Sequence, residues 1–102
     1  MKIYNVLLTE TADNDISDLF DFIVNVYKSY NTAHKFKDGL LKEIKSLKYS
    51  AGSYQISTRK SLLRFGYNSR KVIFKSMTIV YTIHGNDVYI RRVIPSSTIT
   101  GI

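Results

Sequence analysis

Residues 69–94 read SRKVIFKSMTIVYTIHGNDVYIRRVI, and this stretch decides the fold. Two runs, 78–83 and 88–94, are rich in β-branched and aromatic residues, as strands are. The sequence HGND at 84–87 separates them. Gly85 accepts a positive φ at the first central position of a two-residue turn. The two runs are therefore predicted to form a β-hairpin, whose apolar face needs a cover.

That turn also fixes a register. The expected cross-strand pairs are Ile83 with Val88, Thr82 with Tyr89, and Val80 with Arg91. Side-chain alternation then turns Tyr81 and Ile90 toward the cover and leaves Arg91 on the open face. It also points Arg92 to the apolar side, where a charge is unfavourable. A slip of one residue would exchange the two arginines.

The start of the chain is predicted to supply one strand and one helix. Residues 2–8 are apolar on both faces, which is typical of an interior or well-covered strand. Thr9 fits the N-cap of a helix over 10–27. The apolar stripe of this helix has three- and four-residue spacing and comprises Ala12, Ile16, Leu19, Phe20, Ile23 and Tyr27.

A second helix is predicted over 33–47, after a break at 29–32. Asn31 or Thr32 is its expected N-cap. Its apolar stripe comprises Ala33, Phe36, Leu40, Ile44 and Leu47. Gly39 is unfavourable inside a helix and suggests a close helix crossing. The short connection makes the two helices an antiparallel hairpin.

The element order β-α-α-β-β-β predicts a single α+β domain over residues 1–102. We expect the helical hairpin to pack on one face of a mainly antiparallel sheet. The polar tail at 95–102 is expected to be extended. The apolar residues of the intervening segment that need cover are Leu62, Leu63 and Phe65.

Composition narrows the class of protein. The chain has no cysteine, which excludes disulfides and thiolate metal sites and fits a reducing cytosol. The two histidines, His34 and His84, lie far apart, so no metal-site spacing exists. No apolar run reaches membrane-spanning length. The apolar start ends at Thr9 and Glu10, too early for a signal peptide. We expect a cytoplasmic protein with no cofactor and no small-molecule substrate.

Charge is distributed unevenly along the chain. Residues 1–27 hold one base and five acids, whereas residues 28–102 hold fourteen bases and three acids. This asymmetry favours an anionic partner for the second half, either nucleic acid or an acidic protein segment. The candidate target-binding residues are Arg70, Lys71, Lys75 and Arg91, with a second group at Arg59 and Arg64. The alternative is that these side chains are solvated and only protect a sheet edge from aggregation.

Other residues that bear reactive groups have simpler interpretations. Tyr81 is expected in the core, His84 beside a turn and His34 on a helix surface. The sequence has no phosphate-binding glycine loop and no Ser-His-Asp arrangement. We therefore assign no catalytic residue.

Five segments resemble the RelE/ParE superfamily of bacterial type II toxins. Residues 9–16 match "T-x-x-A-x-x-D-[LI]", and 33–47 resemble the family's second helix, which begins "A-x-x-F". The strands match "R-K-[LV]" at 70–72, "I-x-Y-x-I" at 79–83 and "V-x-I-x-R-[VI]" at 88–93. The resemblance implies a small cytosolic toxin of the kind associated with plasmid stabilisation and growth inhibition. Its expected partner is a cognate antitoxin.

The subtype is inferred from the positions at which this chain departs from the pattern of RelE-like members. RelE-like members cut mRNA on the ribosome and usually carry arginine where this chain has Thr78. They also carry basic, His or Tyr residues after the last strand, where this chain has 95–98, PSST. The resemblance therefore favours ParE-like members, which inhibit DNA gyrase by binding. Two alternatives stay open: a ribosome-dependent endoribonuclease, and an inactive relative that acts as an antitoxin-binding or regulatory module.

Overall fold

The computed structural model describes residues 2–56 and 68–98. Its elements follow the predicted order. They are β1 (Asn5–Leu8), α1 (Glu10–Tyr27), α2 (Tyr30–Ser50), the 3-10 helix η1 (Ala51–Ser53), β2 (Arg70–Phe74), β3 (Met77–His84), β4 (Asp87–Pro95) and the 3-10 helix η2 (Ser96–Thr98).

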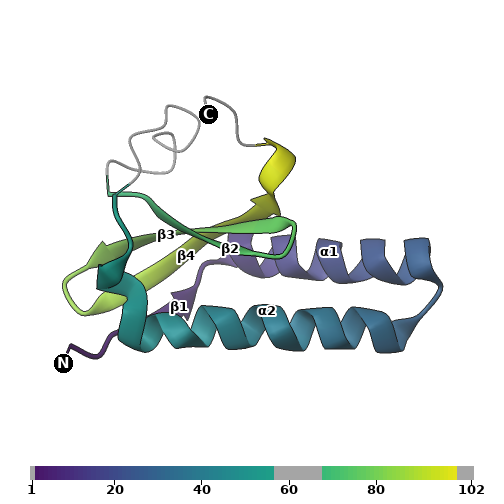
Figure 1. Cartoon of the computed structure of the whole chain (residues 1–102), viewed down its shortest axis with the longest axis horizontal. Helices are drawn as coiled ribbons and strands as arrows, with labels where there is room; N and C mark the ends of the chain where they lie inside the picture. Colours follow the sequence, from purple (N-terminus) through teal and green to yellow (C-terminus); the bar gives the residue numbers. More distant parts are fainter. Residues whose placement is uncertain (1, 57–67, 99–102) are drawn as a thin grey trace.

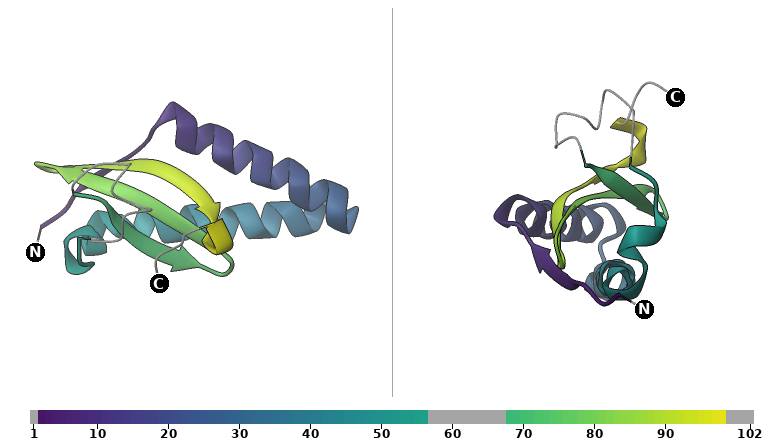
Figure 2. Two further views of the ribbon diagram at one scale, coloured as in Figure 1. Left: turned by 90° about the horizontal axis from the view of Figure 1, so that it is seen from above. Right: turned by 90° about the vertical axis from the view of Figure 1, so that its left-hand side faces the viewer.

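A four-stranded sheet in the order β1-β4-β3-β2 forms one layer, and the helical hairpin forms the other (Figure 1). The β4–β3 and β3–β2 pairs are antiparallel, whereas β1 pairs with β4 in parallel. Figure 2 shows both helices on one side of the sheet. The predicted α+β class and helix-on-sheet packing are confirmed, and the sheet is mixed.

Capping fixes where each helix begins. The Thr9 hydroxyl accepts a hydrogen bond from the backbone N–H of Ala12 at 3.2 Å, as predicted for an N-cap. The predicted cap of the second helix is wrong. Ser29 caps α2 by accepting from the N–H of Thr32, so α2 begins at Tyr30. It also continues to Ser50, three residues past the predicted end.

Strand β1 differs from its prediction. It lies at the edge of the sheet, and Leu7 and Leu8 are each 42% exposed. The run of apolar residues on both faces therefore does not mark an interior strand here. Tyr4, which precedes β1, is buried, and its backbone N–H donates to the carbonyl of Lys48 in α2.

The hairpin turn at Gly85 and Asn86 is confirmed, with a Gly85 φ of 63°. The predicted pairs next to the turn are also confirmed, namely Ile83 with Val88 and Thr82 with Tyr89. The predicted Val80–Arg91 pair is wrong. A β-bulge follows Ile90, so that Tyr81 pairs with Ile90 but Val80 pairs with Arg92.

The bulge resolves the unfavourable position of Arg92. Strict alternation after Ile90 would turn Arg92 inward and Val93 outward. With Arg91 as the extra residue, Val93 pairs with Ile79 and joins the core instead. Both arginines are thereby kept out of the apolar layer.

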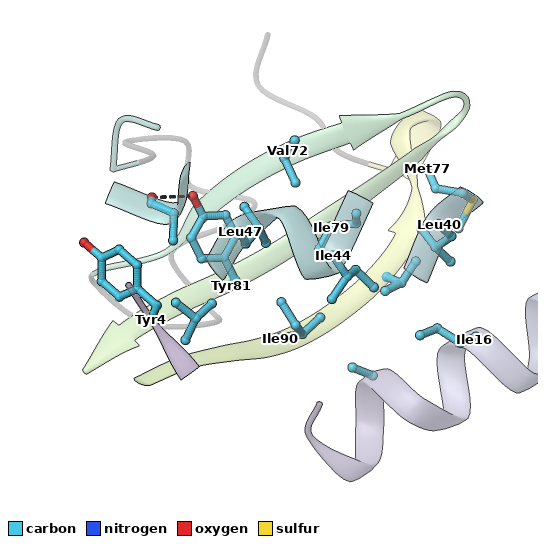
Figure 3. Packing of buried hydrophobic residues seen from close by; sticks show 14 residues of the cluster. Tyr4, Ile16, Leu40, Ile44, Leu47, Val72, Met77, Ile79, Tyr81 and Ile90 are labelled. Atoms are coloured by element: carbon cyan, nitrogen blue, oxygen red, sulfur yellow. Dashed lines mark hydrogen bonds between the residues drawn. The ribbon is translucent and has the colours of Figure 1, made fainter. Parts of the chain in front are cut away.

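The core lies between the sheet and the helices (Figure 3). Tyr81 is fully buried, as predicted, and its hydroxyl donates to the carbonyl of Ala51 at 2.7 Å. Gly39 does not serve a helix crossing. A Cβ atom there would lie 2.8 Å from the ring of Phe74, so glycine allows β2 to approach α2 closely.

Two expectations concern the ends of the sheet. The tail is not extended throughout, because Ser96–Thr98 form the 3-10 helix η2. The N–H of Ser96 donates to the carbonyl of Ser76, which ties the end of β4 to the β2–β3 turn. Leu62, Leu63 and Phe65 lie outside the described residues.

Gly52 offers a test of the packing between η1 and β1. A Cβ atom at Gly52 would lie 2.6 Å from the hydroxyl oxygen of Tyr4 and 3.6 Å from the nearest ring carbon. We expect Gly52→Ala to lower the free energy of unfolding by about 1–3 kcal/mol through overpacking. In a Tyr4→Phe background the same substitution should cost less than half as much. Urea unfolding of the four proteins measures this, and equal costs in both backgrounds would contradict the packing.

Candidate functional site

A groove lies between the helical hairpin and the end of β4 and is called here the terminal groove. Its volume is about 880 Å³. The helices line one side with Asp15, Asp18, Leu19, Phe22, Ile23, Tyr27, Thr32 and Phe36. The sheet lines the other with Ser76, Met77, Arg92, Val93, Ile94, Pro95, Ser96 and Ser97.

The terminal groove exists because the helical hairpin extends beyond the sheet, as Figure 1 shows. Apolar residues near the tip of the hairpin therefore have no strand beneath them. Phe22 is 61% exposed and Tyr27 is 65% exposed. Tyr27 belongs to the predicted core stripe, so the stripe is longer than the core it covers. Exposed apolar surface of this kind is typical of a binding site.

Asp15 holds α1 against β4 at the inner end of the groove. Its carboxylate accepts hydrogen bonds from Nε of Arg92 at 2.7 Å, from Nη2 of Arg92 at 3.2 Å, and from the N–H of Val93 at 2.9 Å. Strand β1 ends at Leu8, which pairs with Ile90. The carboxylate thus satisfies a β4 backbone group that lies beyond the end of β1.

On the sheet face turned away from the helices, called here the open face, Thr78, Val80 and Thr82 are buried, and a second cluster of polar groups lies toward the hairpin turn. It comprises Thr82, His84, Tyr89 and Arg91 and is called here the hairpin cluster. Nε of Arg91 donates to the Thr82 hydroxyl at 3.0 Å, and Nη2 of Arg91 lies 3.3 Å from Nε2 of His84. The guanidinium also lies over the Tyr89 ring, 5.1 Å from its centre.

The structure separates the predicted basic residues. Lys71 pairs with Val80, so Lys71 and Arg91 both lie on the open face. Arg70 pairs with Tyr81 and lies on the helix side. Its Nη1 donates to the carbonyls of Gly52 at 3.1 Å and Tyr54 at 2.7 Å, which holds the segment after α2.

Of the remaining predicted residues, only Lys75 lies in the described part of the chain, and it is not part of the open face. Lys75 lies in the β2–β3 turn, and its ammonium is 5.5 Å from the ring centres of Phe36 and Phe74. Arg59 and Arg64 lie outside the described residues. A binding role for any of these side chains stays a prediction.

Burial raises the pKa of Tyr81 above its usual value, because the ionised phenolate would lose its hydration. The nearby Arg70 guanidinium partly opposes this effect. Tyr81 therefore stays protonated and acts as a hydrogen-bond donor that joins β3 to η1. It has no access to a substrate.

Within residues 2–56 and 68–98, no three His, Cys, Asp or Glu side chains come together as metal ligands. Neither helix of this part is apolar enough along its length to cross a membrane.

The observed topology, with a helical hairpin over one face of a small mixed sheet, defines the class of RelE/ParE-like toxin folds. Among solved structures, a chain described as "Chromosomal ParDE TA system from P. aeruginosa" matches with a TM-score of 0.74 at 16% sequence identity. The match covers 91% of this chain and 96% of that chain. It supports the fold.

The sequence model of the ParE toxin of type II toxin–antitoxin systems, parDE, matches residues 6–99. The chain therefore belongs to the ParE toxin family. No curated protein matches the sequence. The predicted membership of the RelE/ParE superfamily, closer to ParE, is confirmed.

Sequence reasoning named Arg91 of the hairpin cluster but assigned no role to its partners, and it missed the terminal groove. The hairpin cluster depends on which side chains share a face with Arg91, and His84 was interpreted only as a turn residue. The sequence signal for the hairpin cluster was strand alternation, which places residues 82, 84, 89 and 91 on one face beside the turn. No local sequence pattern indicates the terminal groove, because the groove depends on how far the helices extend past the strands.

Tyr81→Phe tests the buried hydroxyl. At neutral pH the variant should lose about 1 kcal/mol of stability with its hydrogen bond. The raised pKa means that the unfolded chain releases this proton near pH 10 while the folded chain retains it. Wild-type stability should therefore fall as pH rises above about 10, and the variant should lack this contribution. The two stability curves should converge in alkali; parallel curves would contradict the assignment.

Proposed function

We propose that this chain inhibits growth by binding a cellular target, DNA gyrase, and that a cognate antitoxin neutralises it. The observation that carries the proposal is membership of the ParE toxin family, with the match over residues 6–99. The terminal groove supports a binding mode of action, because most of its exposed surface is apolar.

The antitoxin is proposed to place an apolar segment in the terminal groove. Phe22 and Tyr27 would lose most of their exposed area there, which supplies favourable apolar burial. The groove lies between α1 and the end of β4, and helices and extended chains are the segments that proteins commonly bind in apolar grooves. Acidic residues of the same antitoxin would then reach the basic open face at Lys71 and Arg91.

Binding without chemistry is also supported by the hairpin cluster. An endoribonuclease needs a group that takes the proton of the attacking 2′-hydroxyl. His84 is the one imidazole on the described part of the open face, and its Nε2 is directed at Thr82 and Arg91. Use of Nε2 as that base would first require His84 to give up these two contacts.

Brief induction of the chain in cells tests the proposal. We expect growth arrest with intact transcripts, and we expect purified chain to inhibit supercoiling of a relaxed plasmid by gyrase. Co-expression of the antitoxin encoded beside the gene should restore growth. Growth curves, mapping of transcript 5′ ends and the supercoiling assay provide the measurements.

Two outcomes would contradict the proposal in different ways. New 5′ ends inside translated messages, lost in a Lys71→Ala, Arg91→Ala double variant, would identify an endoribonuclease. Normal growth and full gyrase activity, with the antitoxin still bound, would identify an inactive relative that serves as an antitoxin-binding module.

A further inference from the structure

Arg91 is held in one orientation by the other members of the hairpin cluster. Thr82 accepts from its Nε, the Tyr89 ring lies under its guanidinium, and His84 lies beside its Nη2. The His84 and Tyr89 rings also contact each other edge to face, with centroids 5.5 Å apart. Such fixing lowers the conformational entropy that a long side chain loses when it binds a ligand.

The fixed guanidinium retains unused hydrogen-bond donors. Within residues 2–56 and 68–98, Nη1 of Arg91 donates to no other residue, and the one ion pair joins Arg92 to Asp15. Arg91 is thus a half-buried, oriented cation with no carboxylate partner in that part of the chain. Its free edge has the fork geometry that matches two oxygens of one anion.

Lys71 supplies a second cation on the same face. It pairs with Val80 of β3, and Val80 in turn lies beside the bulge that contains Arg91. Two strand spacings separate the Lys71 and Arg91 backbones, about 10 Å. Their flexible side chains can therefore contact successive charges of one polyanion.

We propose that the hairpin cluster binds a phosphate of a nucleic-acid backbone through Arg91, with Lys71 contacting a neighbouring phosphate. Arginine and lysine side chains are common contacts to phosphate oxygens. The strong basic excess of residues 28–102 favours the same class of ligand. This inference goes beyond the proposed function, because direct nucleic-acid binding by the isolated chain neither requires nor excludes gyrase inhibition.

The test is binding of a fluorescein-labelled twelve-residue oligothymidylate to the purified full chain, measured by anisotropy at several salt concentrations. Arg91→Ala should weaken binding about tenfold and lower the salt slope by about 0.7. Arg91→Lys keeps the charge but loses the fork, and should weaken binding about threefold. Lys71→Ala should also lower the slope.

Lys45→Ala is the matched control. Lys45 is exposed on α2, on the opposite side of the molecule from the open face, and its removal changes net charge by the same amount. It should leave binding nearly unchanged. Equal losses in Lys45→Ala and Arg91→Ala, or no binding by the wild-type chain at low salt, would overturn the proposal. Competition by polyglutamate as effective as that by unlabelled oligothymidylate would assign the cluster to an acidic protein instead.

Discussion

The carboxylate of Asp15 is the contact on which the rest of the arrangement depends. It accepts hydrogen bonds from Arg92 and from the backbone of Val93, at the point where β1 no longer covers the edge of β4. Thr9 completes the junction, because its hydroxyl donates to the carbonyl of Ile90 at 2.7 Å while it caps α1. Together they set the position of α1 beside β4. The distance between α1 and the end of β4 then defines the terminal groove.

The β-bulge at Arg91 has consequences on both faces of the sheet. On the helix side it brings Ile90 and Val93 into the core together. At the strand edge it places Arg92 within reach of Asp15. On the open face it leaves Arg91 beside Thr82. One inserted residue therefore separates the two adjacent arginines into a structural cation and a surface cation.

Much of the fold could be predicted from the sequence, because strand runs, helix stripes and the Gly85 turn are local patterns. The cap at Ser29 was missed because two nearby residues, Asn31 and Thr32, can also cap a helix. The edge position of β1 and the bulge depend on contacts between distant segments, which no local pattern encodes. The same reason explains why Arg70 could not be assigned to the helix side. Of the candidate site, the basic residue types could be predicted from the sequence. The terminal groove could be recognised only from the three-dimensional arrangement of the helices and strands.

The central claim is that the terminal groove receives the antitoxin. The most direct measurement is the dissociation constant of the cognate antitoxin for Phe22→Glu and Tyr49→Glu. The two aromatic residues are similarly exposed, at 61% and 58%, but only Phe22 lines the groove. The account predicts at least about a tenfold loss of affinity for Phe22→Glu and no change for Tyr49→Glu. Unchanged affinity in Phe22→Glu, or equal losses in both variants, would contradict it.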